Sequence, residues 1–235
     1  MQKKRYQLIE KQQRQQAREQ AALDAKLFEA VEHNYVKGIA HAVEEGANVN
    51  ARNASFYTPL HIAISRGYTR VFIALLNAGA NVDLPTRTLH TPLHLAAQIE
   101  GLDNVTYVTA LLALYADAKR ENRDGMTPAA LAQYQYGKSI GGPSRYAAVN
   151  VFPNYIVDLL NDVQAHPEHR PTIEAFNMEY GRQHLPIDLE ARAQGMVQAA
   201  KFTLVKDPQP LPNVIRPAHE GHVDPSPHLR GKVGK

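Results

Sequence analysis

The chain has 235 residues and a formal net charge of +3, and its 44% hydrophobic and 21% charged residues are ordinary values for a globular protein. It contains no cysteine, which excludes a disulfide framework, a cysteine-ligated metal site and a cysteine nucleophile. No apolar run reaches the roughly 18 residues of a membrane-spanning helix, and no apolar stretch follows the charged N-terminus as in a secretory signal peptide. We therefore expect a soluble cytoplasmic protein.

Residues 1–25 are predicted to form a basic, glutamine-rich helix or arm. The first 23 residues carry six basic and two acidic side chains, whereas the rest of the chain carries 20 basic and 21 acidic ones, so the positive charge belongs to the arm. Alanine and glutamine favour a helix, but the apolar residues form no sustained heptad. Nucleic-acid binding through this arm is a separate hypothesis, although interleaved aromatic residues and a known binding module are absent.

Residues 26–162 contain two short motifs that recur with the same spacing. The first is Thr-Pro-Leu-His or a variant of it, and its copies begin at Thr58, Thr91 and Thr127. The second starts Gly-Ala-Asn or a variant of it, and its copies begin at Gly46, Gly79 and Tyr115. Both motifs recur after 33 and then 36 residues. Two motifs that share one irregular spacing predict tandem copies of a single structural unit.

The first motif has a physical meaning at the start of a helix. A threonine hydroxyl accepts an otherwise unpaired backbone N–H of the first turn, and the proline that follows suits the first helical position. Gly67 ends this helix, and a second helix then runs to Gly79, where a left-handed residue is expected. Each unit is therefore predicted to be two helices and a protruding loop.

This pattern resembles the ankyrin-repeat family over residues 26–162. The resemblance implies an all-α solenoid of about four helix-turn-helix repeats, stabilised by the stacking of neighbours. It also implies that His61 and His94 hydrogen-bond to the backbone of neighbouring loops, and that the protein binds another protein rather than catalysing a reaction.

Two segments follow the array. Residues 163–205 are predicted to be a helical C-terminal cap on the last repeat, with one apolar stripe at Ile173, Phe176 and Tyr180 and a second at Leu189, Ala193, Met196, Val197, Ala200 and Leu204. Residues 206–235 form a proline-rich tail that we expect to be disordered.

No catalytic, cofactor-binding or metal-binding residues are predicted. Gly137-Lys138-Ser139 lacks the earlier glycine and the preceding strand of a phosphate-binding loop; it is expected to close a helix and open an insertion over 137–152, a candidate partner contact. His166-Pro167-Glu168-His169 and His219-Glu220-Gly221-His222 do not have the helical spacing of a zinc site. We interpret them as solvated loop residues.

The loop tips carry the main functional signal. In the family, the tip normally holds Asp or Asn followed three residues later by glycine, but Phe56 and Leu89 stand at the glycine positions of two loops. Exposed aromatic, methionine and arginine side chains are typical of protein interfaces. The predicted partner-binding residues are Phe56, Tyr57, Arg66, Arg87, Leu89, His90, Ile99, Arg123 and Met126. The alternative is that Phe56 and Leu89 fold back onto adjacent turns.

The preferred hypothesis is a monomeric, non-enzymatic binding module for another protein. The architecture also resembles effectors that intracellular bacteria deliver into host cells, which would place the protein in the host cytoplasm with a host protein as partner. An enzyme with a catalytic C-terminal segment is the main alternative, and it requires a polar pocket that joins residues 137–152 to His166, His169 or His184.

Overall fold

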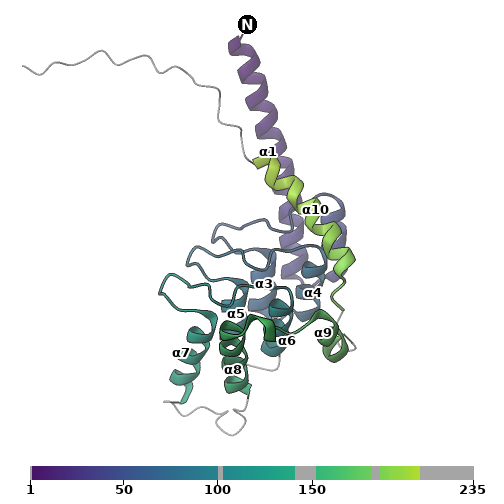
Figure 1. Cartoon of the computed structure of the whole chain (residues 1–235). Coiled ribbons are helices and arrows are strands. Elements are labelled where there is room, and N and C mark those ends of the chain that lie inside the picture. The colour runs from purple at the N-terminus through teal and green to yellow at the C-terminus, as the bar shows by residue number, and fades with distance from the viewer. Residues whose placement is uncertain (1, 100–102, 141–151, 182–185, 207–235) are drawn as a thin grey trace, which may run out of the picture.

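The computed structural model describes residues 2–99, 103–140, 152–181 and 186–206, and every regular element in these ranges is a helix (Figure 1). The elements are α1 (Gln2–Glu32), α2 (Val36–Glu44), α3 (Pro59–Arg66), α4 (Thr69–Asn77), α5 (Pro92–Gln98), α6 (Asp103–Ala113), α7 (Pro128–Ile140), α8 (Phe152–Ala165), the short 3-10 helix η1 (Pro167–His169), α9 (Ile173–Tyr180) and α10 (Leu189–Lys206).

Helices α1 to α8 pack as four consecutive pairs, and the predicted all-α solenoid of about four repeats is confirmed. The first helices of the pairs, α1, α3, α5 and α7, are neighbours in one layer, and α2, α4 and α6 lie in a second layer behind them. The two layers enclose a continuous core, in which Leu60, Phe72, Leu93 and Tyr107 are fully buried. Because each pair buries its apolar face only against the next pair, the array depends on stacking.

The histidines of the Thr-Pro-Leu-His motif join one repeat to the next. The Nδ1 atom of His61 accepts the backbone N–H of Thr58 at 3.2 Å, so the ring proton is on Nε2, which donates to the carbonyl of His90 at 3.3 Å. His94 repeats this arrangement with Thr91 and with the carbonyl of Met126, at 3.2 and 3.0 Å. Burial lowers the pKa of both histidines to about 4. The implied structural role of His61 and His94 is confirmed.

The turns that follow α2, α4 and α6 share one geometry. In each turn the N–H of a left-handed residue and the N–H of the next residue bond back to the last turn of the helix, which is a Schellman motif. The left-handed residues are Gly46, Gly79 and Tyr115, with φ of 103°, 84° and 63°. Tyr115 stands where the other two turns have glycine, the residue that adopts this conformation without strain. The conserved hydrogen bonds show that the turn is kept and the tyrosine is strained.

Helix α1 crosses the boundary that the sequence placed at residue 25. It is one helix from Gln2 to Glu32, exposed up to residue 19, and its N-terminal half projects beyond the array (Figure 1). Gln20 donates to the carbonyl of Gly46 at 3.0 Å, and Asp24 accepts the N–H of Asn48 at 2.8 Å. The last turns of the predicted arm are therefore bound to the first repeat.

The asparagine and aspartate side chains of the loops extend this link along the array. The contact between Asp24 and Asn48 is repeated between Asn50 and Asn81 and between Asp83 and Asp117, each at 2.8–2.9 Å from side-chain oxygen to backbone nitrogen. Asn50 and Asp83 thus each accept a backbone N–H from the next unit, which fixes the offset between neighbouring loops.

The C-terminal helices lie at a different place from the one expected. They turn back along the second layer, where α9 packs against α6 and α10 against α4, instead of covering the last repeat. In α9 the predicted stripe faces inward, because Phe176 is fully buried and Ile173 and Tyr180 are half-buried.

The predicted apolar stripe of α10 is wrong over its described part. Leu189, Met196 and Val197 are 52–63% exposed, and Ala193 is exposed as well. The helix instead packs through Arg192 and Gly195. A Cβ on Gly195 would lie 2.3 Å from the carbonyl oxygen of Ala78, so only glycine permits this approach.

Arg192 supplies the polar part of the same contact. Its guanidinium donates to the carbonyls of Leu76 and Ala80 at 2.7 and 3.0 Å, and burial lowers its pKa. The amide of Asn77 bonds to the backbone of Pro186 and Asp188 on the segment that leads into α10. The carbonyl groups at the end of α4 have no partner within their own helix and require donors from elsewhere. These hydrogen bonds, and not the apolar residues of α10, determine how α10 packs.

Candidate protein-binding surface

Three loops project side by side from the array, and we call them finger 1 (51–57), finger 2 (84–90) and finger 3 (119–126) (Figure 1). Each tip is closed by the same two backbone hydrogen bonds, one of them between residues four apart: Asn53 to Tyr57, Thr86 to His90, and Asn122 to Met126, at 2.9–3.0 Å. Side-chain oxygens of Asn53, Thr86 and Asn122 cap the same turns. The three tips therefore share one hydrogen-bonding pattern.

Each tip has one residue with left-handed backbone, three positions after the Asn or Thr that caps the turn. It is Gly125 in finger 3, with φ of 72°, but Phe56 and Leu89 in the other two, with φ of 65° and 62°. A large side chain in this region costs on the order of 1–2 kcal/mol relative to ordinary backbone. Phe56 is 41% exposed and Leu89 is 45% exposed, so neither side chain is fully buried. Phe56 lies against Arg87 of the neighbouring finger, so folding back onto an adjacent turn stays a prediction beside the contact surface.

Two arginines flank the ring of Phe56. The guanidinium carbon of Arg52, from the same finger, lies 5.7 Å from the ring centroid, and that of Arg87, from finger 2, lies 5.2 Å from it. Both distances are those of cation–π pairs. Arg87 was among the predicted residues, whereas Arg52 was missed, because its approach depends on how the chain folds at the start of the finger.

Fingers 2 and 3 are joined through polar groups. The N–H of Arg123 donates to the carbonyl of Thr88 at 3.0 Å, and the amide of Asn122 lies 3.3 Å from Nε2 of His90. Nδ1 of His90 contacts the hydroxyl of Thr88 at 2.8 Å. His90 therefore connects fingers 2 and 3, whereas the Arg123 side chain is exposed.

The other predicted residues divide into two groups. Tyr57 and Met126 are half-buried at the base of their fingers, where Tyr57 makes an edge contact with His61. Arg66 is the last residue of α3 and Ile99 follows α5, so they lie about 10 Å along the helices from the fingers. Arg66 is exposed, whereas Ile99 packs partly against the core. The structure brings Phe56, Arg87, Leu89, His90 and Arg123 together and leaves Arg66 and Ile99 apart.

The fingers are basic although the body of the protein is not. Arg52 and Arg87 are the charged residues of fingers 1 and 2, and finger 3 has three basic and two acidic side chains, so each finger carries a net charge of +1. The surface therefore combines exposed apolar side chains with arginines, which is the composition of many protein interfaces.

The phosphate-loop resemblance has no structural support. The sequence predicted that a helix ends at Gly137-Lys138. This prediction is wrong, because α7 continues through Ser139 to Ile140. A phosphate-binding loop needs non-helical backbone before its helix. The remainder of the insertion, His184, and His219 with His222 lie outside the described residues. Among the residues that the structure describes, no helix is long and apolar enough to cross a membrane.

The paired helices, the left-handed turns and the fingers define a repeat protein of the ankyrin class. Residues 27–122 match the family model described as ankyrin repeats, in three copies. Residues 27–122 are therefore a set of ankyrin repeats, and α7 and α8 add a fourth helix pair beyond the matched range. A search of curated proteins gave no match. Ankyrin repeats are generally protein–protein interaction modules, and the family is typically non-enzymatic.

Proposed function

We propose that this protein is a binding module that captures another protein through the tips of fingers 1 and 2, with finger 3 and the exposed ends of the inner helices at the rim. The observation that carries the proposal is the left-handed backbone of Phe56 and Leu89. Large side chains are held exposed in positions that glycine would occupy without strain. An unfavourable backbone conformation at a side chain that stays partly exposed is typical of a functional site.

The surface also indicates the chemistry of the partner. Phe56 and Leu89 provide two apolar contacts on neighbouring fingers, Arg52 and Arg87 flank Phe56, and Arg123 adds positive charge on finger 3. Such a surface fits a protein that offers an apolar pocket with acidic side chains at its edge. The resemblance in architecture to bacterial effectors makes a host protein the first class of partner to test.

The test is a capture experiment with the full chain and two matched double variants. Phe56→Ser/Leu89→Ser removes the proposed contacts, and Met178→Ser/Val197→Ser removes two exposed apolar side chains from α9 and α10. A partner of the fingers should be captured by the wild type and the second variant and lost from the first. Capture that survives in the finger variant, with circular dichroism unchanged, overturns the proposal.

The basic arm suggests a control for a different source of affinity. Binding that depends on residues 2–19 and falls steeply with salt would indicate nucleic acid as the ligand. Binding through the fingers should instead persist in a chain that lacks these residues, since their side chains are exposed and make contacts chiefly within α1.

A further inference from the structure

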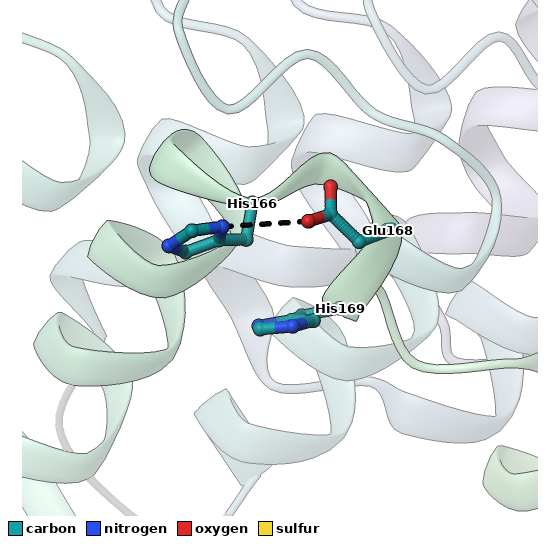
Figure 2. Close-up of side chains that lie close together, drawn as sticks. All are labelled: His166, Glu168 and His169. Carbon is teal, nitrogen blue, oxygen red and sulfur yellow. Dashed lines mark ion pairs between the residues drawn. The ribbon is translucent and has the colours of Figure 1, made fainter.

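Four side chains able to bind a metal ion meet where the chain leaves the last repeat. Figure 2 shows three of them, His166, Glu168 and His169, around η1. One ligand atom of each lies within 4.8 Å of the other two. The fourth is Asp162, in the last turn of α8, whose two carboxylate oxygens each lie 3.1 Å from Nδ1 of His169.

Local backbone structure holds this cluster together. The N–H of His166 donates to the carbonyl of Asp162 at 2.7 Å, and the N–H of His169 donates to the carbonyl of His166 at 2.9 Å. Pro167 fixes the backbone at the start of η1. The two imidazole rings consequently stack, with centroids 4.9 Å apart and planes at 28°. The scaffold that the sequence did not reveal is thus the end of α8 together with η1.

The distances are close to those of a metal site. Zinc with nitrogen and oxygen ligands at about 2.0–2.2 Å in tetrahedral geometry places neighbouring ligand atoms about 3.3 Å apart. Nδ1 of His166 already lies 3.3 Å from Glu168 Oε1 (Figure 2). The other ligand atoms lie within 4.8 Å of one another, so the exposed side chains must rotate to bring them to the tetrahedral separation.

The kind of ligand decides the kind of ion. Imidazole nitrogens favour zinc and related transition metals, whereas magnesium and calcium prefer sites made of oxygen alone. We propose that His166, Glu168 and His169 bind one Zn²⁺ ion, with water completing the coordination. Asp162 acts as a positioning residue, because a hydrogen bond from Nδ1 of His169 orients the ring and leaves Nε2 for the ion.

The position of the site indicates what the ion does. Arg170 directly follows His169, donates to the carbonyl of Ala116 at 2.7 Å, and lies 5.7 Å from the ring centroid of Tyr115. This contact begins the return of the chain along the second layer. An ion held by His166, Glu168 and His169 fixes the geometry of that corner, and it stabilises the return segment because it binds the folded state preferentially.

Isothermal titration of the tag-free full chain with zinc chloride at neutral pH tests the proposal. We expect one saturable equivalent in the wild type and no saturable binding of magnesium chloride. His166→Gln/His169→Gln should weaken zinc binding by more than about 100-fold, and Asp162→Asn should weaken it less, by about 10–100-fold, which is typical of groups that orient a ligand. All four side chains are exposed, so these variants should keep the circular dichroism of the wild type.

Two matched controls locate the ion. His33→Gln/His41→Gln removes exposed histidines of the first repeat, including one that pairs with Glu45, and His219→Gln/His222→Gln removes the pair in the C-terminal segment. Both controls should bind zinc as the wild type does. Absence of binding in the wild type, an unchanged affinity in His166→Gln/His169→Gln, or loss of the equivalent in either control overturns the assignment. Failure here leaves the proposed protein-binding role untouched, because the fingers share no residue with this cluster.

Discussion

The left-handed residues of the fingers give a prediction whose sign is unusual. At Leu89, replacement by glycine should leave the protein more stable than replacement by alanine, although alanine is the better residue in most of a folded chain. The two variants lose the same side-chain contacts beyond Cβ. They differ only in whether a Cβ is present at φ of 62°.

The magnitude follows from two opposing contributions. A Cβ in the left-handed region costs on the order of 1–2 kcal/mol, and the greater freedom of glycine in the unfolded chain costs about 0.4–1 kcal/mol. The difference favours glycine by about 0.5–1 kcal/mol. With a urea dependence of about 2 kcal/mol per molar for a protein of this size, the unfolding midpoint of Leu89→Gly should lie about 0.25–0.5 M above that of Leu89→Ala.

Urea unfolding followed by circular dichroism measures this difference. Ala54 in finger 1 is exposed and is not among the positive-φ residues, so it provides the control. Ala54→Gly should lower the midpoint, because only the unfolded-chain contribution acts there. Equal midpoints for the two Leu89 variants, or a higher one for alanine, would refute the inference that this tip is strained.

Two further predictions concern the buried histidines and α10. The ordinary pKa of histidine is about 6.5, and that of buried His61 is about 4, so the unfolded chain binds protons first as the pH falls. The contribution of this residue to the free energy of unfolding should be fully present above about pH 6.5 and should fall by up to about 3 kcal/mol by pH 4. Urea midpoints that do not decrease over this pH range would contradict the buried, neutral state of His61. Gly195→Ala should release α10 and abolish hydrogen-exchange protection around residues 189–197, whereas the control Gln194→Ala, at an exposed position, should keep this protection. Equal protection in both variants would show that the close approach of Gly195 to Ala78 is not required.

The repeats were predictable because their determinants are local. Thr58 caps a helix, Pro59 starts it and Gly79 ends the next one, so spacing and residue type together specify the unit. The exposure of Phe56 and Leu89 was predictable from the same repeat spacing, because the spacing places both residues at finger tips whatever their side chains are.

The return of α9 and α10 was not predictable from periodicity. Arg192 and Gly195 hold α10 through backbone carbonyls and close approach, and neither contact produces an apolar stripe. Likewise, the sequence did not predict the cluster around His169 because Asp162 belongs to the preceding helix, and the corner between α8 and η1 brings the two residues together. Contacts made by hydrogen bonds to the backbone leave little trace in a sequence pattern.

The return of α10 changes how the array should come apart. In a simple solenoid each repeat touches only its neighbours, so the end repeats can fray while the middle stays folded. Here Arg192 bonds to Leu76 and Ala80 in the second repeat, more than a hundred residues earlier in the chain. Repeats three and four lie between Ala80 and Arg192 in the sequence. The contact between these residues therefore ties the end of the array back to the second repeat, so that the last repeats are not a free end. We therefore expect the C-terminal repeats to unfold together with the second repeat rather than one at a time.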